Sequence, residues 1–587
     1  MGDIGALICD GAVRDIRYRG IEVVRSVDCP VRDENWATST PQDVSETLSE
    51  GGDAVRFARD FTVFGGQLAC RFAAEFRAQE VRISAELSAR ERILTNRAGL
   101  TLLHPIRGVS GTDLTIRHSD RTEEATRFPD RVMPGQPAFD IAGLDHGVHG
   151  IAVRIAFHGE VFEMEDQRNW TDASYKTYCR PLALPTPDEI AAGETVRQAI
   201  TIRCDGQPVA SATAAVARPP QCLPEVALAA EPEWWGPAAE ASAAALLPGP
   251  VLLRLEAERV SDLPAVGTAE LEVVTSDTGD LGSELQGVAA AAARAGVAVS
   301  HVSALPRAYL RSYQPTAVWP DGTTPEDAAA AAKAAFPDAR IGLGMLTNFT
   351  EFNRCPPQPG VGTYTTYSTT ALVHAGDDRS VLETLDALAD VHASAAHLSG
   401  DRPRRLGLAT IGMRTNPYGA GVVANPSLER IAMAQDDPRQ RTVFGAAFAL
   451  GAYTQAAMAG VRRIALAGLG GPFATGEFRA GCFGAWPIHH VIRALRDMAG
   501  ATAVSPPDLP PGTSAIFASA ADGTRGIVAN TSLSPVSLML PGHLARHLGA
   551  DTDASAPDWL DTAPTRPADD LSLEPMELAF VTRGDGP

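Results

Sequence analysis

The sequence predicts a multidomain protein of β plus α/β class, with an N-terminal antiparallel β-sandwich, a central (β/α)8 TIM-like barrel and a small C-terminal β domain. A chain of 587 residues exceeds what one core supports at ~100–200 residues per domain. Two Pro-rich stretches, ARPPQCLPE (217–225) and PPDLPPG (506–512), divide the chain, and the local sequence pattern changes at each. We therefore expect domains at residues 1–217, 226–505 and 512–587.

The N-terminal region is predicted to be all-β as far as about Cys204. Short stretches with alternating apolar and polar residues follow one another with turn residues between them. Such alternation is typical of antiparallel strands with one buried face. The clearest stretches are VRDIRYRGIEVV, AVRFARDFTVFGG, LACRFAAEFRAQEVRISAEL and GIAVRIAFHGEVFEMED.

The middle region alternates short apolar strands with helical segments, which is typical of parallel β/α units. Six strands are clear: PVLLRLEAE, LEVVTSD, GVAVSHVSAL, ARIGLGMLTNF, LGLATIGMR and RRIALAGLGG. The helices include SELQGVAAAAARAG, PEDAAAAAKAAF and SVLETLDALADVHASAAHL. An eight-stranded barrel needs two more strands, which we expect around Val318 and within YTTYSTTALV (364–373).

The C-terminal region is predicted to add a small sheet from TSAIFASA, RGIVANTS, SPVSLMLPG and ELAFVTRG. The apolar run at 443–461 contains Gly, Ala, Thr454 and Gln455. This composition favours a helix packed on a sheet over a membrane span.

The composition excludes several classes of partner. Lys plus Arg number 50 and Asp plus Glu 71, so the net charge of −21 argues against a non-specific grip on nucleic acid or an anionic membrane. The eight cysteines show no CxxC and no regular spacing, and the N-terminus lacks the pattern of a signal peptide. These features predict a cytoplasmic protein without a disulfide framework; assembly into a homo-oligomer stays open.

Candidate reactive residues follow the predicted barrel strands, because the C-terminal ends of barrel strands converge on one mouth. Glu258 ends a polar face that also holds Arg254 and Glu256, and Asn348 and Glu351 follow the fourth strand. A carboxyl at that position is typical of acid/base chemistry in barrel glycosidases. The structural alternatives are ion pairing with Arg254 for the first strand, and a Glu351–Arg354 pair at a helix start.

Four further polar residues follow strand-like runs: His374, Arg414, Asn416 and Glu477. Each suits contact with a sugar-like hydroxyl or carboxylate, although a lone His is as often a hydrogen-bonded structural residue. The histidine pairs at 146/149 and 489/490 lack further ligands at persuasive spacing, so no metal site or cofactor is predicted and metal dependence stays open.

The stretch EMEDQRNWTDASYKTY (163–178) is unusually rich in charged and aromatic residues. As one strand it carries charge on both faces, which an ordinary sandwich strand avoids. It is therefore a candidate for a functional or interdomain site, with Glu165, Asp166, Arg168, Asn169 and Trp170 as the residues concerned. The alternative is a solvated edge strand with aromatic residues packed beneath it.

The segment FEMEDQRNWTDASYKTYCRPLALP (162–185), most specifically its MEDQRNWTDAS core, resembles the D-apionate lactonase family of bacterial branched-pentose catabolism. The stretch VRDENWAT (31–38) and the order of the three domains support the resemblance, which extends over nearly the whole chain. It implies a carboxylic ester hydrolase in D-apiose catabolism that opens a sugar lactone, D-apionolactone, to D-apionate. It transfers no catalytic residues.

Lactone opening needs a general base for water, donors for the oxyanion and contacts to the sugar hydroxyls. The chain has no GxSxG motif, so a carboxylate that activates water is the simplest hypothesis. Glu351 or Glu258 is the candidate base, Arg414 or His374 the group that polarises the carbonyl, and Asn348 and Asn416 the groups that orient hydroxyls.

Two other functions remain open at this point. A retaining glycoside hydrolase is one, with Glu351 and Glu477 as acid/base and nucleophile. A catalytically inactive carbohydrate-binding protein is the other, and it requires a barrel mouth without a carboxyl of raised pKa.

Overall fold

The computed structural model describes residues 3–34, 38–209, 222–260, 263–313, 318–521 and 523–584. The chain forms two compact units: Met1–Arg168 with Ala173–Val216, and Asn169–Asp172 with Ala217–Pro587. Parts of two stretches singled out in the sequence, VRDENWAT and the joint at 217–225, lie outside the described residues. The predicted domain limits, which fall partly there, stay a prediction.

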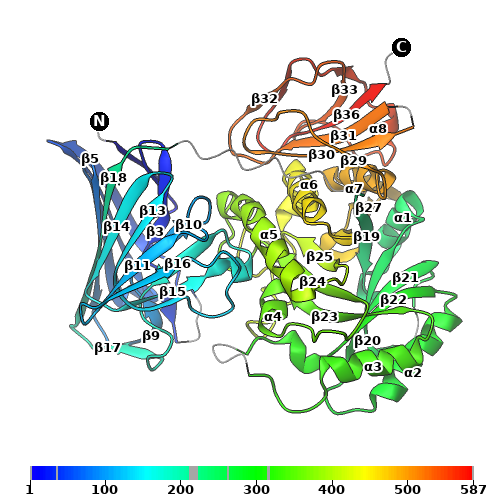
Figure 1. Cartoon of the computed structure of the whole chain (residues 1–587), viewed down its shortest axis with the longest axis horizontal. Helices are drawn as coiled ribbons and strands as arrows, with labels where there is room; N and C mark the ends of the chain where they lie inside the picture. Colours follow the sequence, from blue (N-terminus) through cyan, green and yellow to red (C-terminus); the bar gives the residue numbers. More distant parts are fainter. Residues whose placement is uncertain are drawn as a thin grey trace. The chain divides into compact units, whose positions relative to one another are not determined.

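The first unit is an antiparallel β structure, as predicted (Figure 1). Its main sheet has the path β1-β2-β3-β10-β16-β15-β13-β14-β18-β8-β7-β6-β5, with β11 paired to β12 and β13, and a second sheet has the order β17-β9-β4. The main path runs through β1 (Ile4–Cys9), β2 (Ala12–Tyr18), β3 (Ile21–Asp28), β10 (Thr101–Pro105), β16 (Ser174–Tyr178), β15 (Phe162–Asp166), β13 (Ala138–Val148), β14 (Ile151–His158), β18 (Thr195–Gly206), β8 (Glu80–Ala89), β7 (Leu68–Phe76), β6 (Ala54–Val63) and β5 (Gln42–Gly51). The remaining strands are β11 (Asp113–His118), β12 (Glu123–Arg127), β17 (Asp188–Ile190), β9 (Ile93–Ala98) and β4 (Val31–Asp33).

Burial along these strands follows the alternation read from the sequence. In β8 every second residue from Val81 to Ala89 is buried, which gives the sheet one apolar face. β15 and β16 differ, because every residue of both strands is buried. Both lie inside the sheet, between β10 and β13, so the alternative of a solvated edge strand is wrong.

The second unit contains a closed barrel of eight parallel strands, as predicted. The strands are β19 (Glu225–Ala230), β20 (Val251–Glu256), β21 (Thr268–Thr275), β22 (Ala298–Pro306), β23 (Arg340–Asn348), β24 (Tyr364–Thr370), β25 (Arg405–Thr410) and β26 (Arg463–Gly468). All six clear predictions and the expected strand within 364–373 are confirmed. The strand expected around Val318 is wrong: Val318 is exposed coil, and the eighth strand is β19, directly after the Pro-rich joint.

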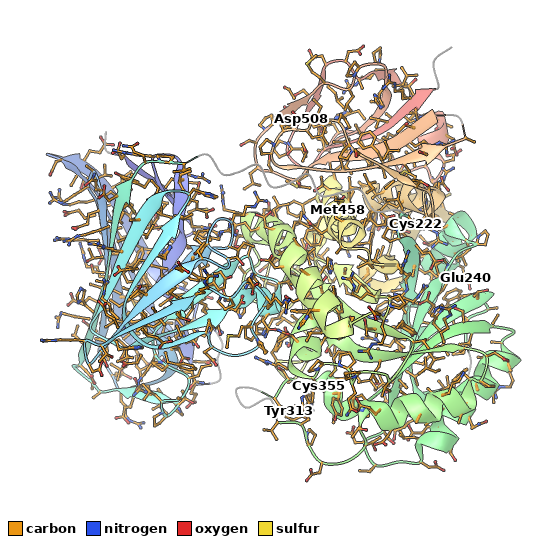
Figure 2. The ribbon with its side chains drawn as sticks, in the orientation of Figure 1. Cys222, Glu240, Tyr313, Cys355, Met458 and Asp508 are labelled. Atoms are coloured by element: carbon orange, nitrogen blue, oxygen red, sulfur yellow. The ribbon has the colours of Figure 1, made fainter. Side chains whose placement is uncertain are left out.

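Helices lie between the barrel strands (Figure 1). They are α1 (Pro237–Leu246), α2 (Leu281–Arg294), α3 (Pro325–Ala335), α4 (Phe349–Arg354), α5 (Asp378–Ser399), α6 (Val443–Met458) and α7 (Pro487–Asp497). Local sequence sets their starts: Thr324 and Asp327 form a capping box at α3, and Pro325 occupies its first turn. The apolar run at 443–461 forms helix α6 as far as Met458 (Figure 2). In the described part of the chain, no helix has both the length and the apolarity that a membrane crossing requires. The cytoplasmic location stays a prediction.

The C-terminal segment adds the predicted small β structure. One sheet has the order β29-β30-β31-β36-β33-β34, and a second pairs β32 with β35. Their bounds are β29 (Ala503–Val504), β30 (Thr513–Ala520), β31 (Gly523–Asn530), β32 (Val536–Leu538), β33 (Leu544–Leu548), β34 (Arg566–Pro567), β35 (Leu571–Leu573) and β36 (Leu578–Gly584), with the short helix α8 (Trp559–Thr562) between them. A hairpin of β27 (Gly476–Arg479) and β28 (Cys482–Ala485) precedes α7.

Candidate active site

Glu351 is the most unusual carboxyl group at the C-terminal ends of the barrel strands. It lies in α4, which begins directly after β23 and ends before Cys355 (Figure 2). The side chain is 0% exposed, and no hydrogen bond of ordinary geometry reaches either carboxylate oxygen from the described residues, although the Thr347 and Ser312 hydroxyls lie near it and act to lower its pKa. Burial raises the pKa of Glu351 to about 7, although the nearby charge of Arg354 acts in the opposite direction. A carboxyl group with this pKa exchanges protons near neutral pH.

Two neutral polar groups lie close to this carboxyl. Asn348 ends β23, and its buried Nδ2 makes no hydrogen bond of ordinary geometry with a described residue, although the amide lies near the Tyr418 hydroxyl. The Tyr418 hydroxyl, from the loop after β25, lies 2.8 Å from Thr350 Oγ1. Burial and then the charge of Glu351 raise the pKa of Tyr418 well above its ordinary value, so this phenol stays protonated. The site therefore places an amide and a protonated phenol beside an acid that titrates.

The four residues Asn169–Asp172 belong to the barrel unit, although β15 and β16 on either side of this turn belong to the first unit. The carbonyl oxygen of Asn169 accepts a hydrogen bond from Thr350 Oγ1 at 2.6 Å, and its Oδ1 accepts one from Asn353 Nδ2 at 3.0 Å. Thr171 Oγ1 donates to the carbonyl of Thr370, the last residue of β24, at 2.9 Å. These bonds fix the segment to α4, which follows β23, and to the end of β24.

Trp170 and Asp172 in this segment contact charged groups of the barrel. The Arg354 guanidinium lies over the Trp170 ring at 5.1 Å, and the His374 ring meets the same indole edge-on at 5.8 Å between centroids. Asp172 Oδ2 is 2.6 Å from His374 Nδ1. An aspartate bonded to one ring nitrogen fixes the orientation of the imidazole and directs its other nitrogen away. The predicted residues Asn348, Glu351, Asn169, Trp170 and His374 are thus linked through shared neighbours.

Arg414 belongs to a separate ion-pair network inside the barrel. Its Nε donates to Glu231 at 2.7 Å and its Nη1 to Glu272 at 2.8 Å, whereas its buried Nη2 has no partner among the described residues. Glu272 also accepts from Arg254 Nε at 2.9 Å, because these two residues stand side by side in the register of β20 and β21. Burial opposes ionisation of Glu272, but Arg254 and Arg414 outweigh it and lower its pKa. The expected partner of Arg254 was therefore misplaced: it is Glu272, not a carboxyl of its own strand.

Three predicted residues are not part of the Glu351 group. Glu258 is half-exposed and pairs with Arg307 Nη2 at 2.8 Å. Glu477 lies in β27 and pairs with the exposed Arg479 at 2.9 Å. Asn416 Oδ1 accepts the Tyr418 backbone N–H at 2.9 Å, so it shapes the loop that carries Tyr418.

The other charged residues of the 163–178 segment pair within the first unit. Glu165 accepts from Lys176, its cross-strand neighbour, at 2.7 Å. Arg168 binds Asp166 through both Nε and Nη2 at 2.9 and 2.7 Å, with both side chains fully buried. Burial raises the pKa of Asp166 and Arg168 opposes this effect. The charge density that marked this stretch in the sequence comes from two buried ion pairs, one between the neighbouring strands β15 and β16 and one between the last residue of β15 and the turn that follows it.

Sequence reasoning missed several residues of the group. Asp172 lies in the quoted segment, but its partner His374 is 202 positions away, and no local pattern joins them. Tyr418 directly follows Asn416 and Pro417 in the sequence, and no motif marks it as a reactive residue. Glu270 and Glu272 alternate along β21, and that spacing of two in an apolar strand was a usable sign of a charged barrel interior. Among the described residues, no three His, Cys, Asp or Glu side chains are arranged to hold a metal ion.

The chain is similar to D-apionate lactonases over most of its length. Residues 1–207 match the family described as D-apionate lactonase, N-terminal domain, and residues 255–500 match D-apionate lactonase, TIM barrel domain. The D-apionate lactonase of Brucella anthropi is 35% identical over 539 residues, covering 84% of this chain and 86% of that protein.

Similarity to solved structures is weaker. A β-arabinopyranosidase shares 10% identity at a TM-score of 0.32, covering 99% of this chain and 98% of its own. A glycoside hydrolase family 30 subfamily 8 xylanase from Clostridium acetobutylicum shares 8% identity at a TM-score of 0.38, covering 62% of this chain and 97% of its own. The two family matches and the extent of the Brucella anthropi match together place the chain in the D-apionate lactonase family.

Proposed function

We propose that the protein is a carboxylic ester hydrolase that opens D-apionolactone to D-apionate in the catabolism of D-apiose. Family membership supports the substrate class. The observation that carries the mechanism is Glu351, a buried carboxyl with a pKa of about 7 at the C-terminal end of a barrel strand. Strongly perturbed carboxyls at that end of a TIM barrel are typical of catalytic groups.

Glu351 acts as the general base in this proposal. Its carboxylate takes a proton from water as the water oxygen forms a bond to the lactone carbonyl carbon. The tetrahedral oxyanion then collapses, the bond between that carbon and the ring oxygen breaks, and Glu351 returns the proton to the departing oxygen. A group with a pKa near the working pH suits both transfers, because it is neither too weak a base nor too weak an acid.

The neighbours of Glu351 have the roles of donors and positioning groups. Asn348 Nδ2, buried and without a hydrogen bond of ordinary geometry to a described residue, is placed to donate to the oxyanion or to a sugar hydroxyl. His374, whose Nδ1 is hydrogen-bonded to Asp172 and whose ring packs edge-on against Trp170, is assigned to positioning the 169–172 segment. Arg414 is already engaged by two carboxylates, so we assign it to holding Glu231 and Glu272 rather than to polarising the carbonyl. Asn416 acts through the Tyr418 loop.

The structure favours Glu351 over Glu258 as the base. Glu258 is half-exposed, and its carboxylate is already engaged by Arg307 in an ion pair at 2.8 Å. Glu351 lacks such a partner among the described residues. The two replacements therefore have different expected effects.

The test compares Glu351→Gln, Glu258→Gln and the matched control Glu240→Gln, an exposed glutamate of α1 (Figure 2). Acid release from D-apionolactone is followed by pH-stat, with the spontaneous rate subtracted. We expect Glu351→Gln to lower kcat by about 10²–10⁴ and the other two variants to keep near-normal turnover. Near-normal turnover of a folded Glu351→Gln variant would remove Glu351 as the base. Release of sugar from aryl glycosides, without acid release from lactones, would instead support the glycosidase.

A further inference from the structure

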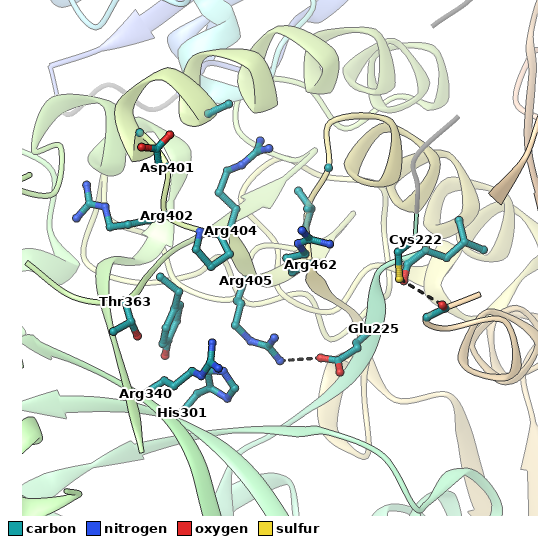
Figure 3. Close-up of a pocket in the computed structure, with 18 residues that line it drawn as sticks. Cys222, Glu225, His301, Arg340, Thr363, Asp401, Arg402, Arg404, Arg405 and Arg462 are labelled. Carbon is teal, nitrogen blue, oxygen red and sulfur yellow. Dashed lines mark hydrogen bonds and ion pairs between the residues drawn. The ribbon is translucent and has the colours of Figure 1, made fainter. Parts of the chain in front are cut away.

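The N-terminal end of the barrel carries a cavity of 640 Å³ that takes no part in the proposed lactone chemistry. It is lined by residues at the starts of the barrel strands and in the loops that precede them, whereas Glu351 and its neighbours follow strand ends. Figure 3 shows its labelled side chains gathered around one space. The residues that carry the argument are Arg340, Arg402, Arg404, Arg405 and Arg462.

The charge of this lining is opposite to that of the protein as a whole. Five arginines face two carboxylates, Glu225 and Asp401, on a chain with a net charge of −21. The arginines come from three places: the run Arg402–Arg405 before and in β25, Arg462 before β26, and Arg340 at the start of β23. Because β25 and β26 are neighbours in the barrel, these separate runs combine into one basic lining.

Two of these arginines are held by neutral groups. Arg402 donates to the carbonyls of Ser399, Val361 and Pro357 at 3.0, 2.7 and 3.2 Å. Arg404 donates to the carbonyls of His392, at 2.9 Å, and Ala459. Carbonyl oxygens satisfy the N–H groups without cancelling the positive charge. The loop is therefore built around fixed guanidinium charges.

Of the five lining arginines, Arg405 is the one for which the described residues provide carboxylate partners. Arg405 donates to Glu225 at 2.8 Å, as Figure 3 shows, and also to the buried Glu270. Neither Arg340 nor Arg462 makes a side-chain hydrogen bond or ion pair with any other residue that the structure describes. Two guanidinium groups thus border the cavity, and the described residues leave their hydrogen-bonding capacity unused.

The arginine charges around the cavity also contribute to the lowered pKa of His301. Its pKa is lowered to about 4, first by burial and then by the charges of Arg405, Arg463 and Arg340, while Glu270 acts in the opposite direction. The imidazole is therefore neutral at neutral pH and adds a donor or acceptor to the lining without adding charge.

We propose that this cavity binds a compact polyanion, a small molecule with two or more phosphoryl or carboxylate groups. Planar guanidinium groups match phosphate and carboxylate oxygens in pairs, and several of them around one space favour a ligand with several oxyanions. A ligand of this charge offsets the mutual repulsion of the arginines, which the two lining carboxylates only partly do. The site is separate from the lactone chemistry, so its occupancy is measured by binding alone.

The test uses the full chain with pyrophosphate and citrate as probes in isothermal titration calorimetry at low ionic strength. We expect at least one probe to bind with a Kd below about 1 mM, and Arg340→Gln/Arg462→Gln to weaken that binding at least about tenfold. The pair of probes separates the two sources of oxyanion: tighter pyrophosphate assigns the site to phosphoryl groups, and tighter citrate assigns it to carboxylates.

The matched control is Arg566→Gln/Arg583→Gln, which removes the same charge from exposed positions of the C-terminal sheet that do not line the cavity. It should leave the affinity unchanged. An equal loss in both double variants would show that overall charge and not the cavity attracts the probe, and would overturn the proposal. Failure of both probes to bind the unmodified protein would overturn it as well. Circular dichroism and Tm confirm that the variants are folded.

Discussion

Two buried glutamates in the same barrel have opposite proton affinities. Glu270 faces the barrel interior near the strand starts, where burial acts to raise its pKa but Arg463 and Arg405 lower it to about 2. Glu351 follows a strand end, where burial prevails and raises the pKa to about 7. Both side chains are almost completely buried. The difference shows that the partners supplied by the fold, and not burial itself, decide whether a carboxyl is a fixed charge or a proton carrier.

The partners of Glu270 come from across the barrel. Arg405 lies in β25 and Arg463 in β26, and β25 is not a neighbour of β21 in the barrel order. Arg463 donates to Glu270 through Nε at 2.9 Å and also through Nη2. Such contacts hold the strands together, in line with the stabilising role of the bottom face of TIM barrels. Glu351 has no comparable pair and is available for chemistry.

The largest expected effect on stability comes from breaking the Glu270 pair. Arg463→Met leaves a buried carboxylate with only part of its compensation, and we expect the free energy of unfolding to fall by about 3–5 kcal/mol. Urea unfolding measures this. Arg340→Gln removes a guanidinium from the same end that has no ion pair with a described residue, and should change stability by less than about 0.5 kcal/mol. Equal effects of the two variants would contradict the assignment of Glu270 as a structural charge.

A smaller expected effect is the pH dependence of stability, which differs in sign between Glu351 and Glu270. The folded-state pKa of Glu351 lies above its unfolded value, so the unmodified protein loses stability as pH rises from about 4.5 to about 7, by up to about 3 kcal/mol. Glu351→Gln lacks this titration, so its Tm relative to the unmodified protein should increase over that range and then level off. For Glu270 the sign is reversed: its depressed pKa gives stability above about 4.5 that is lost as pH falls toward about 2.

Calorimetric Tm values at pH 5, 6, 7 and 8 for Glu351→Gln and the unmodified protein test this prediction. Glu240→Gln serves as the matched control, because it removes one carboxyl from an exposed position. A constant difference for Glu351→Gln would show that its carboxyl titrates normally and would remove the contrast between the two glutamates.

Local sequence patterns predicted most of the architecture. The residue alternation predicted in the N-terminal strands appears in the structure, because these strands bury one face. The strand–helix alternation predicted for the barrel also appears, because helices cover its apolar strands. The strand β19 was missed since its six residues directly follow a Pro-rich joint and resemble its continuation. The strand predicted around Val318 rests on the strand number of a closed barrel and not on a local pattern, and Val318 is exposed coil in the structure.

The candidate site was predictable only in part. Asn348 and Glu351 could be found because the residue after a barrel strand is placed by topology. The sequence could not show how the 163–178 segment divides between the two units, because the division depends on tertiary contacts. Asn169 and Trp170 belong to the barrel unit, whereas Glu165 and Arg168 pair within the first unit. A sequence also does not reveal which carboxyl finds an arginine across a barrel.

The pH dependence of kcat/KM for lactone opening tests the central claim most directly, because it reports the ionisation of the free enzyme's essential base. With the spontaneous rate subtracted, the account predicts that kcat/KM rises with pH to a plateau through a limb centred at about 7, and that this limb is absent from the residual activity of Glu351→Gln. A limb centred near the ordinary glutamate value of about 4.3, or one that persists in Glu351→Gln, would contradict it.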